Sequence, residues 1–188
     1  MKFNQFAIDG AWLAESDVHA DNRGNFSEWF KKFEIEKATG FNFEVAQANI
    51  STSHKGVLRG IHYSLAEIGQ AKWVTCVSGS ILDVIVDIRE GSPTYGKYET
   101  IKLEPKLGKS VLIGPGIGHG FIALEDSSSV AYLLSSQYSP ADEYGINPFD
   151  IEIKINWGVE IAEATLSDKD KNAPSLETQK ATGKLPKY

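Results

Sequence analysis

The sequence predicts a mainly β fold, a sandwich or barrel, from three observations. First, apolar residues alternate between two faces of Ser80–Ile88, and one face carries Leu82, Val84, Val86 and Ile88. The other face carries Ile81, Asp83, Ile85 and Asp87. Second, several short β-rich runs are separated by Gly, Pro, Asn and Ser clusters, which is typical of all-β sandwiches and barrels. Third, helical periodicity is weak until the C-terminus.

Eight strands are expected in the middle of the chain. In chain order they are Phe26–Phe33, Phe43–Ser51, Trp73–Val77, Ser80–Ile88, Tyr98–Leu103, Ser110–Ile113, Phe121–Glu125 and Val130–Ser136. Gly79 and Ser80 separate two of these runs closely enough to predict a hairpin. Short helices are expected to begin at Ser167 and to cover Ser175–Lys180, and the segment after Gly183 resembles a tail. No repeat, linker or boundary interrupts the chain, so residues 1–188 are expected to form a single domain.

Composition narrows the class of protein. A chain of 188 residues with 41% hydrophobic and 23% charged residues is ordinary for a soluble globular protein with a real core. The net charge of -6 argues against nucleic acid as a partner, which usually requires a basic face. Cys76 is the only cysteine, which excludes an intrachain disulfide and suits a reducing compartment. Neither a secretory signal nor a long apolar run is present, so we expect a cytoplasmic protein without a membrane partner.

Two of the four histidines are candidates for chemistry. His19 and His54 lie in polar surroundings and are expected to be solvated. His62 and His119 lie beside glycines, which allow the close backbone approach that ligand sites often need. The spacing alone is explained equally well in two ways. The glycines could simply form turns beside histidines that have local hydrogen-bond partners, or the histidines could belong to a ligand site.

The spacing around these two histidines resembles the two cupin motifs. Gly56 precedes His62 at the spacing of the first motif, and Pro115 with its following glycines precedes His119 as in the second. A metal-binding cupin also needs a histidine two positions after the first, where this chain has Ser64, and Glu67 is off the usual spacing. Transition-metal sites usually have about three or four protein ligands, so no metal and no cofactor are expected.

A histidine without a metal can act as a general base, especially with a carboxylate on its other ring nitrogen. Tyr132 could supply the acid, since it shares the strand face of Val130 and Leu134, although a core aromatic explains that position equally well. Strict strand alternation puts Arg59 and His62 on opposite faces, unless Gly60 hosts a bulge.

A series of motifs then resembles the dTDP-4-dehydrorhamnose 3,5-epimerase family. The motifs are Asp21–Phe26, Gln47–Asn49, Lys55–Tyr63, Gln70–Lys72, Asp83–Arg89, Ser92–Gly96, His119–Phe121, Tyr138–Pro140 and Ser167–Asp170. Their order and spacing make a chance match very improbable. The resemblance implies a cupin-like jelly-roll β-barrel with short C-terminal helices.

The resemblance also implies roles for individual residues. His62 matches the base, Asp170 its orienting partner with Asp168 as the competing candidate, Tyr132 the acid, and Lys72 the cation beside the developing enolate. Arg59 and Arg23 match residues that hold the diphosphate. The implied substrate-binding set is Arg23, Glu28, Gln47, Asn49, Arg59, Lys72, His119, Glu143 and Lys169.

The implied reaction is cofactor-free epimerisation of a dTDP-4-keto-6-deoxyhexose at C3 and C5 through an enolate, in deoxysugar (dTDP-rhamnose type) biosynthesis. Departures from the family pattern leave the number of inverted centres open. They are Ser64, Trp73, Gly118 and Leu133. A 3- or 5-only epimerase, a keto-isomerase, a metal-dependent cupin and a catalytically silent sugar-nucleotide-binding cupin remain alternatives. The resemblance further implies a homodimer in which the region around Arg23 and Glu28 reaches the neighbour's pocket.

Overall fold

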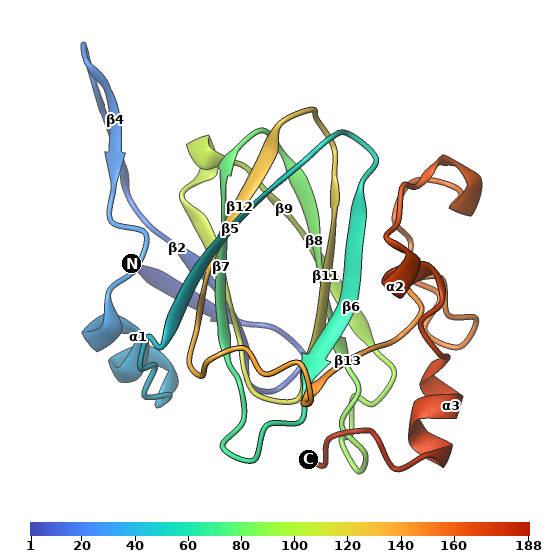
Figure 1. The fold of residues 1–188 in the computed structure, drawn as a ribbon. Coiled ribbons are helices and arrows are strands. Elements are labelled where there is room, and N and C mark those ends of the chain that lie inside the picture. Colours follow the sequence, from blue (N-terminus) through green and yellow to red (C-terminus); the bar gives the residue numbers. More distant parts are fainter.

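The computed structural model describes residues 1–188 as two β-sheets that face one another and enclose a barrel interior (Figure 1). The six-stranded sheet contains, from edge to edge, β1 (Lys2–Gln5), β2 (Ala11–Glu15), β10 (Lys109–Ile113), β7 (Lys72–Ser78), β12 (Ser128–Leu134) and β5 (Gln47–Ser53). The five-stranded sheet contains β13 (Glu143–Gly145), β6 (Leu58–Ser64), β11 (Ile117–Ala123), β8 (Ile81–Asp87) and β9 (Tyr98–Leu103). The mainly β prediction is therefore confirmed.

The remaining elements lie outside the two sheets. A separate hairpin of β3 (Val18–Asp21) and β4 (Gly24–Ser27) projects away from the barrel at the upper left of Figure 1. Helix α1 (Lys32–Thr39) lies beside the six-stranded sheet, and α2 (Asp168–Lys171) and α3 (Leu176–Ala181) lie beside the five-stranded one. Pro105–Leu107 and Ile161–Glu163 form single 3-10 turns. No helix has the length and apolarity needed to span a membrane.

Both faces of β8 are apolar because both are buried. Ile81 and Ile85 point between the sheets, into a cluster shared with Val74 of β7 and Val130 of β12. Alternate residues of β8 point outward and are covered by the C-terminal segment, in a cluster that includes Val84, Val86, Ile88, Trp157, Leu176 and Leu185. Such two-sided burial explains why apolar residues occur on both faces of this strand.

The expected strand Phe26–Phe33 is wrong over most of its length, because β4 ends at Ser27 and the chain then turns into α1. The aromatic run packs onto the outer face of the six-stranded sheet, where Phe30 meets the Trp73 ring edge-on with centroids 5.8 Å apart. Gly40 ends the helix in the left-handed conformation and donates its N–H to the carbonyl of Glu36. The next strand begins only at Gln47, and the eight expected strands do not include β1, β2, β3, β6 or β13.

The predicted hairpin between the runs at Trp73 and Ser80 is also wrong. Strand β7 pairs with β10 and β12, whereas β8 pairs with β11 and β9, so the chain passes from one sheet to the other at Gly79. Gly79 has a φ of +69°, and a Cβ there would lie 2.5 Å from Ser128 Oγ. This position therefore requires glycine for a tight crossover rather than for a hairpin turn.

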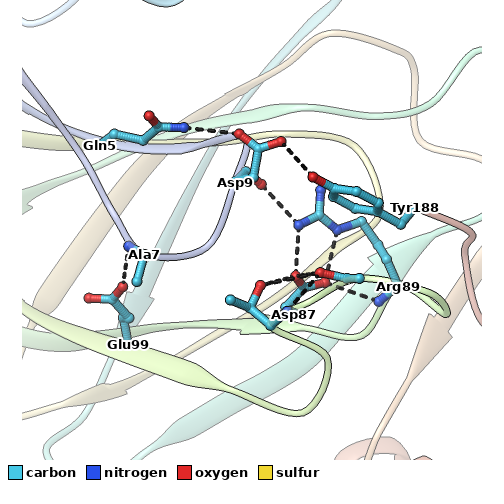
Figure 2. A network of polar contacts seen from close by, with 9 residues as sticks. Gln5, Ala7, Asp9, Asp87, Arg89, Glu99 and Tyr188 are labelled. Atoms are coloured by element: carbon cyan, nitrogen blue, oxygen red, sulfur yellow. Dashed lines mark hydrogen bonds and ion pairs between the residues drawn. The ribbon is translucent and has the colours of Figure 1, made fainter.

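The segment after Gly183 is not a free tail (Figure 2). Leu185 is buried, and the backbone N–H of Tyr188 donates to the carbonyl of Glu90 at 3.1 Å. Arg89 Nη2 donates to Asp87 Oδ2 at 2.8 Å and to the carbonyl of Asp9 at 2.9 Å, while its guanidinium lies 4.9 Å from the centroid of the Tyr188 ring. The C-terminal segment is thus held to the barrel by backbone hydrogen bonds, by buried Leu185 and by the contact of Tyr188 with Arg89 of a buried ionic network.

Removing the cation of this network is expected to destabilise the fold. Burial would raise the pKa of Asp87, but hydrogen bonds from Arg89, Ser92 and Thr94 outweigh it and hold the pKa at about 2. Arg89→Met leaves that carboxylate buried without its counter-charge, so the free energy of unfolding at pH 7 should fall by about 3–5 kcal/mol. Urea denaturation measures the change, with the exposed cation of the Lys102–Glu104 pair as control. Lys102→Met should cost less than about 1 kcal/mol.

The same network sets a pH dependence. Because the folded pKa of Asp87 lies below its usual 3.8, its stabilising contribution is complete above that value and is lost as the pH falls through about 2. The difference in stability between the unaltered protein and Arg89→Met should therefore shrink between about pH 4 and pH 2. If the difference in unfolding free energy between the two proteins stays constant from about pH 4 to pH 2, ionised Asp87 is not the partner that Arg89 stabilises.

Candidate active site

A cavity of about 160 Å³ lies in the barrel interior between the two sheets. Strands β6 and β11 form one wall, and β5, β7 and β12 form the other. The lining residues are Ser51, Arg59, His62, Lys72, His119, Gly120, Phe121, Val130 and Tyr132. Five of the residues predicted to take part in catalysis or binding are thus brought together in one cavity.

A bulge in β6 allows Arg59 and His62 to share this cavity. The β6–β11 register pairs His119 with His62 and Phe121 with Arg59, so β6 has one extra residue between the two pairs. Gly60 lies in this irregularity with a φ of +118°, and a Cβ there would lie 2.5 Å from Gly120 Cα. The bulge considered at Gly60 is therefore present and re-aims one of the two side chains.

His62 is joined to a buried carboxylate. Asp170 Oδ1 lies 2.5 Å from His62 Nε2, and the Asp170 side chain is only 6% exposed. Ser167 caps α2 by accepting the N–H of Asp170 at 3.1 Å, which fixes this residue in the first turn. Burial would raise the pKa of Asp170, but the hydrogen bond with His62 is among the contacts that lower it overall, so the group is a carboxylate at neutral pH. Asp168 is exposed, so Asp170 is the partner of His62 in this structure.

Tyr132 faces the cavity from the opposite sheet. It lies on β12, directly across from Asn49 of β5, and it packs against the interior cluster. Burial raises the pKa of its phenol, opposed by Arg59 and assisted by Glu143. A raised pKa keeps the phenol protonated at neutral pH, as a proton donor requires.

Lys72 places a buried ammonium group in the same cavity. The residue is 9% exposed, and its Nζ makes one long contact of 3.4 Å with the carbonyl of His62. Burial lowers the pKa of Lys72, whereas the charges of Glu143 and Asp83 raise it. Its charge therefore depends on these neighbouring carboxylates.

The other predicted binding residues divide into two groups. Gln47 and Asn49 are joined by a hydrogen bond of 2.9 Å on β5, and Glu143 lies on β13, opposite Ser64 of β6. Arg23, Glu28 and Lys169 do not line this cavity. The Arg23 side chain is 86% exposed on the projecting hairpin and pairs with Asp21.

Two cavity groups were missing from the predicted site. Ser51 lines the cavity, and Asp83 lies behind it with its Oδ1 2.7 Å from His119 Nε2. Three buried side-chain atoms have no hydrogen-bond partner, and they are Ser51 Oγ, Asp83 Oδ2 and Glu143 Oε1. All three belong to residues in or beside this cavity, which makes it a site built for a polar ligand.

No group of three or more His, Cys, Asp and Glu side chains is arranged to hold a metal ion. What the cavity does contain is a histidine, paired with the Asp170 carboxylate, on one wall, and a phenol and a buried ammonium group on the other wall. A β-barrel with this interior defines a class, the enzymes that catalyse proton transfer at a bound substrate.

The chain belongs to the dTDP-4-dehydrorhamnose 3,5-epimerase family, whose sequence profile matches residues 5–178. It is 44% identical over 182 residues to the dTDP-4-dehydro-6-deoxyglucose 3-epimerase of Streptomyces bikiniensis, covering 97% of this chain and 92% of the relative. It is 42% identical over 189 residues to the dTDP-4-dehydrorhamnose 3,5-epimerase of Mycobacterium tuberculosis, covering 100% of this chain and 94% of the relative.

A solved structure gives the same result. The crystal structure of ChmJ, a 3'-monoepimerase from Streptomyces bikiniensis, in complex with dTDP-quinovose superposes with a TM-score of 0.94 at 44% identity, covering 98% of this chain and 92% of that one. The predicted family and the cupin-like jelly-roll fold are confirmed, and the chain is an isomerase acting on carbohydrates. The expected epimerase function in dTDP-deoxysugar biosynthesis agrees with these relatives.

Proposed function

We propose that this chain epimerises a dTDP-4-keto-6-deoxyhexose at C3 and C5, with His62 as base and Tyr132 as acid. The observation that carries the proposal is their placement on opposite walls of one cavity, His62 on β6 and Tyr132 on β12. Inversion of a carbon centre requires that a proton leave one face and another arrive on the opposite face. Two groups on one wall could exchange a proton but could not invert the centre.

The chemistry follows from the ketone. C3 and C5 both flank the C4 carbonyl, so loss of either proton gives an enolate. Asp170 occupies Nε2 of His62, so Nδ1 is the ring nitrogen left for the substrate carbon. His62 takes the proton, the C–H electron pair moves into the enolate, and the Lys72 ammonium stabilises the charge on the C4 oxygen. Tyr132 then protonates the carbon from the other face; afterwards His62 releases its extra proton to solvent and Tyr132 takes one up from solvent.

We propose that the nucleotide part of the substrate is bound by residues from two copies of the chain. Arg59 is positioned by Ser53 Oγ at 3.1 Å and is suited to bind the diphosphate. Arg23 and Glu28 lie on and next to the projecting hairpin, where they cannot line their own cavity. We infer that a homodimer places them at the partner's site.

Mixing two inactive variants tests this arrangement. Arg23→Ala and His62→Ala chains should each be inactive, and their hybrid dimers should contain one intact site. Random mixing should then restore about a quarter of the unaltered activity. No recovery in a mixture shown to contain hybrid dimers would contradict the exchange, and a monomer in light scattering at assay concentration would contradict the dimer itself.

Isotope exchange tests the reaction. The protein and a dTDP-4-keto-6-deoxyglucose substrate are incubated in deuterated water and followed by NMR. Deuterium at both C3 and C5 is the expected result. Label at C3 alone would reduce the function to that of a 3-epimerase, which the 44% identical relative favours as the second candidate. No label at either carbon, with substrate bound, would leave only a sugar-nucleotide-binding protein.

Asp170 and Asp168 provide a matched pair of substitutions. Asp170→Asn should lower kcat by about 100-fold, because His62 loses the charge that orients it and stabilises its protonated form. Asp168→Asn changes an exposed carboxylate two residues away and should leave kcat within about twofold. Steady-state kinetics decides between them, and equal losses in the two variants would contradict the assigned pair.

A further inference from the structure

Asp83 is the one fully buried carboxylate beside the cavity to which the mechanism assigns no role. It lies on β8 with 0% exposure, on the same inward face as Ile81 and Ile85. One carboxylate oxygen meets His119 Nε2 at 2.7 Å, and the other has no hydrogen-bond partner. A buried charge is costly unless nearby groups compensate for it, so the surroundings of Asp83 must supply that compensation.

Two cationic or potentially cationic groups lie within reach. His119 is on the neighbouring strand β11 and is only 10% exposed. Lys72 approaches from the opposite sheet, and Asp83 is one of the two carboxylates whose charge acts on it. The second is Glu143, which has a carboxylate oxygen without a partner. Lys72 makes no ion pair, so its charge rests on these two anions rather than on a direct contact.

We propose that Asp83 is a positioning residue that serves as the shared counter-charge of Lys72 and His119. By accepting a hydrogen bond from His119 Nε2–H, it fixes the imidazole so that Nδ1 is the ring nitrogen free to bind the substrate. By its negative charge, it keeps Lys72 an ammonium group inside a buried cavity. Asp83 itself touches no reacting atom; it acts through His119, which faces the substrate, and through Lys72, which stabilises the enolate. The inference rests on the proposed function, because it assigns Lys72 a task in the reaction.

The isosteric substitution Asp83→Asn removes the charge and retains the shape. We expect kcat to fall by about 10- to 100-fold while KM changes by less than about threefold, since the loss falls on the developing enolate rather than on the bound ground state. The matched control is Asp87→Asn, four residues along β8 and equally buried, in the network of Figure 2. That variant should lower the melting temperature and leave kcat of the folded protein unchanged.

The pH profile separates positioning from structure. The groups near Lys72 that titrate or carry charge are Asp83, Glu143, His62, His119, Tyr132 and Arg59. Without the charge of Asp83 the ammonium form of Lys72 is less stable, so the alkaline limb of kcat against pH should move to lower pH in Asp83→Asn. A merely structural role would lower activity without moving this limb.

Chemical rescue provides a second route that does not require the amide variant to fold. Asp83→Ala leaves space for a small carboxylate, and added formate should restore part of kcat whereas the neutral formamide should not. Asp83→Asn with unaltered kcat and pH profile, or rescue by formate and formamide alike, would overturn the inference. The isotope experiment on the unaltered protein is independent of this result. Absence of exchange in that experiment would contradict the proposed function. Normal exchange there, combined with Asp83 variants whose kcat and pH profile are unchanged, would contradict only the role of Asp83.

Discussion

His62→Asn should lower the rate of epimerisation by about 10⁴-fold, the upper end of what a positioned general base contributes. Three neighbouring groups, Asp170, Lys72 and Tyr132, are unsuited to replace the imidazole. Asp170 remains behind it, but its pKa is lowered overall and it is held in the first turn of α2 by Ser167. Lys72 is needed as an ammonium group, and Tyr132 is on the opposite wall. The substrate should still bind, because the variant leaves Arg59 and Lys72 in place.

Two measurements check this prediction. NMR in deuterated water follows exchange at C3 and C5, and calorimetry with dTDP follows binding. Loss of exchange with dTDP affinity unchanged is expected. The control is His54→Asn, which changes a histidine that is 91% exposed and should have no effect on either measurement. Residual exchange within about tenfold of the unaltered rate would show that another group is the base.

The strands that were predicted well are those whose pattern is set by local burial. The observed bounds of β9 match the expected ones and those of β8 differ by one residue at each end, because both runs are rich in apolar and β-branched residues. The segment before helix α1 was taken for a strand because aromatic residues such as Trp29 and Phe30 are enriched in strands. Their packing around Trp73 is a non-local contact that the local sequence does not reveal. The C-terminal segment was missed for the same reason, since its anchors at Asp9 and Arg89 lie far away in the chain.

The site residues show the same contrast between what the local sequence indicates and what only non-local contacts determine. The family resemblance indicated His62, Lys72 and Tyr132 and favoured Asp170, but the sequence could not exclude Asp168 as the partner of His62. Two positions apart on a helix means a rotation of about 200°, so only one of the pair can face His62, and the helix phase decides which. Asp83 was visible in the sequence as a charge on the inward face of β8. Its partners, His119 and Lys72, come from β11 and β7, and only the folded barrel brings these strands around one cavity.

Tyr132→Phe should separate proton removal from proton return. The substitution removes only the phenolic hydroxyl, so formation of the inverted product should fall by about 10³-fold. His62 is intact, so it can still take the substrate proton, exchange it with solvent and return deuterium to the same face. Exchange should therefore exceed inversion, whereas in the unaltered protein inversion accompanies exchange.

One NMR time course in deuterated water measures both quantities, since label and configuration are read from the same sugar signals. Tyr98→Phe is the matched control, because the Tyr98 hydroxyl meets the backbone N–H of Asn156 at 3.2 Å, outside the cavity. Equal loss of exchange and inversion in Tyr132→Phe would mean that the phenol is needed for the first proton transfer. An unchanged rate of inversion in Tyr132→Phe would show that Tyr132 takes no part in the reaction and is only a core aromatic residue. Only the predicted difference between the two rates requires a base and an acid on opposite walls of the barrel.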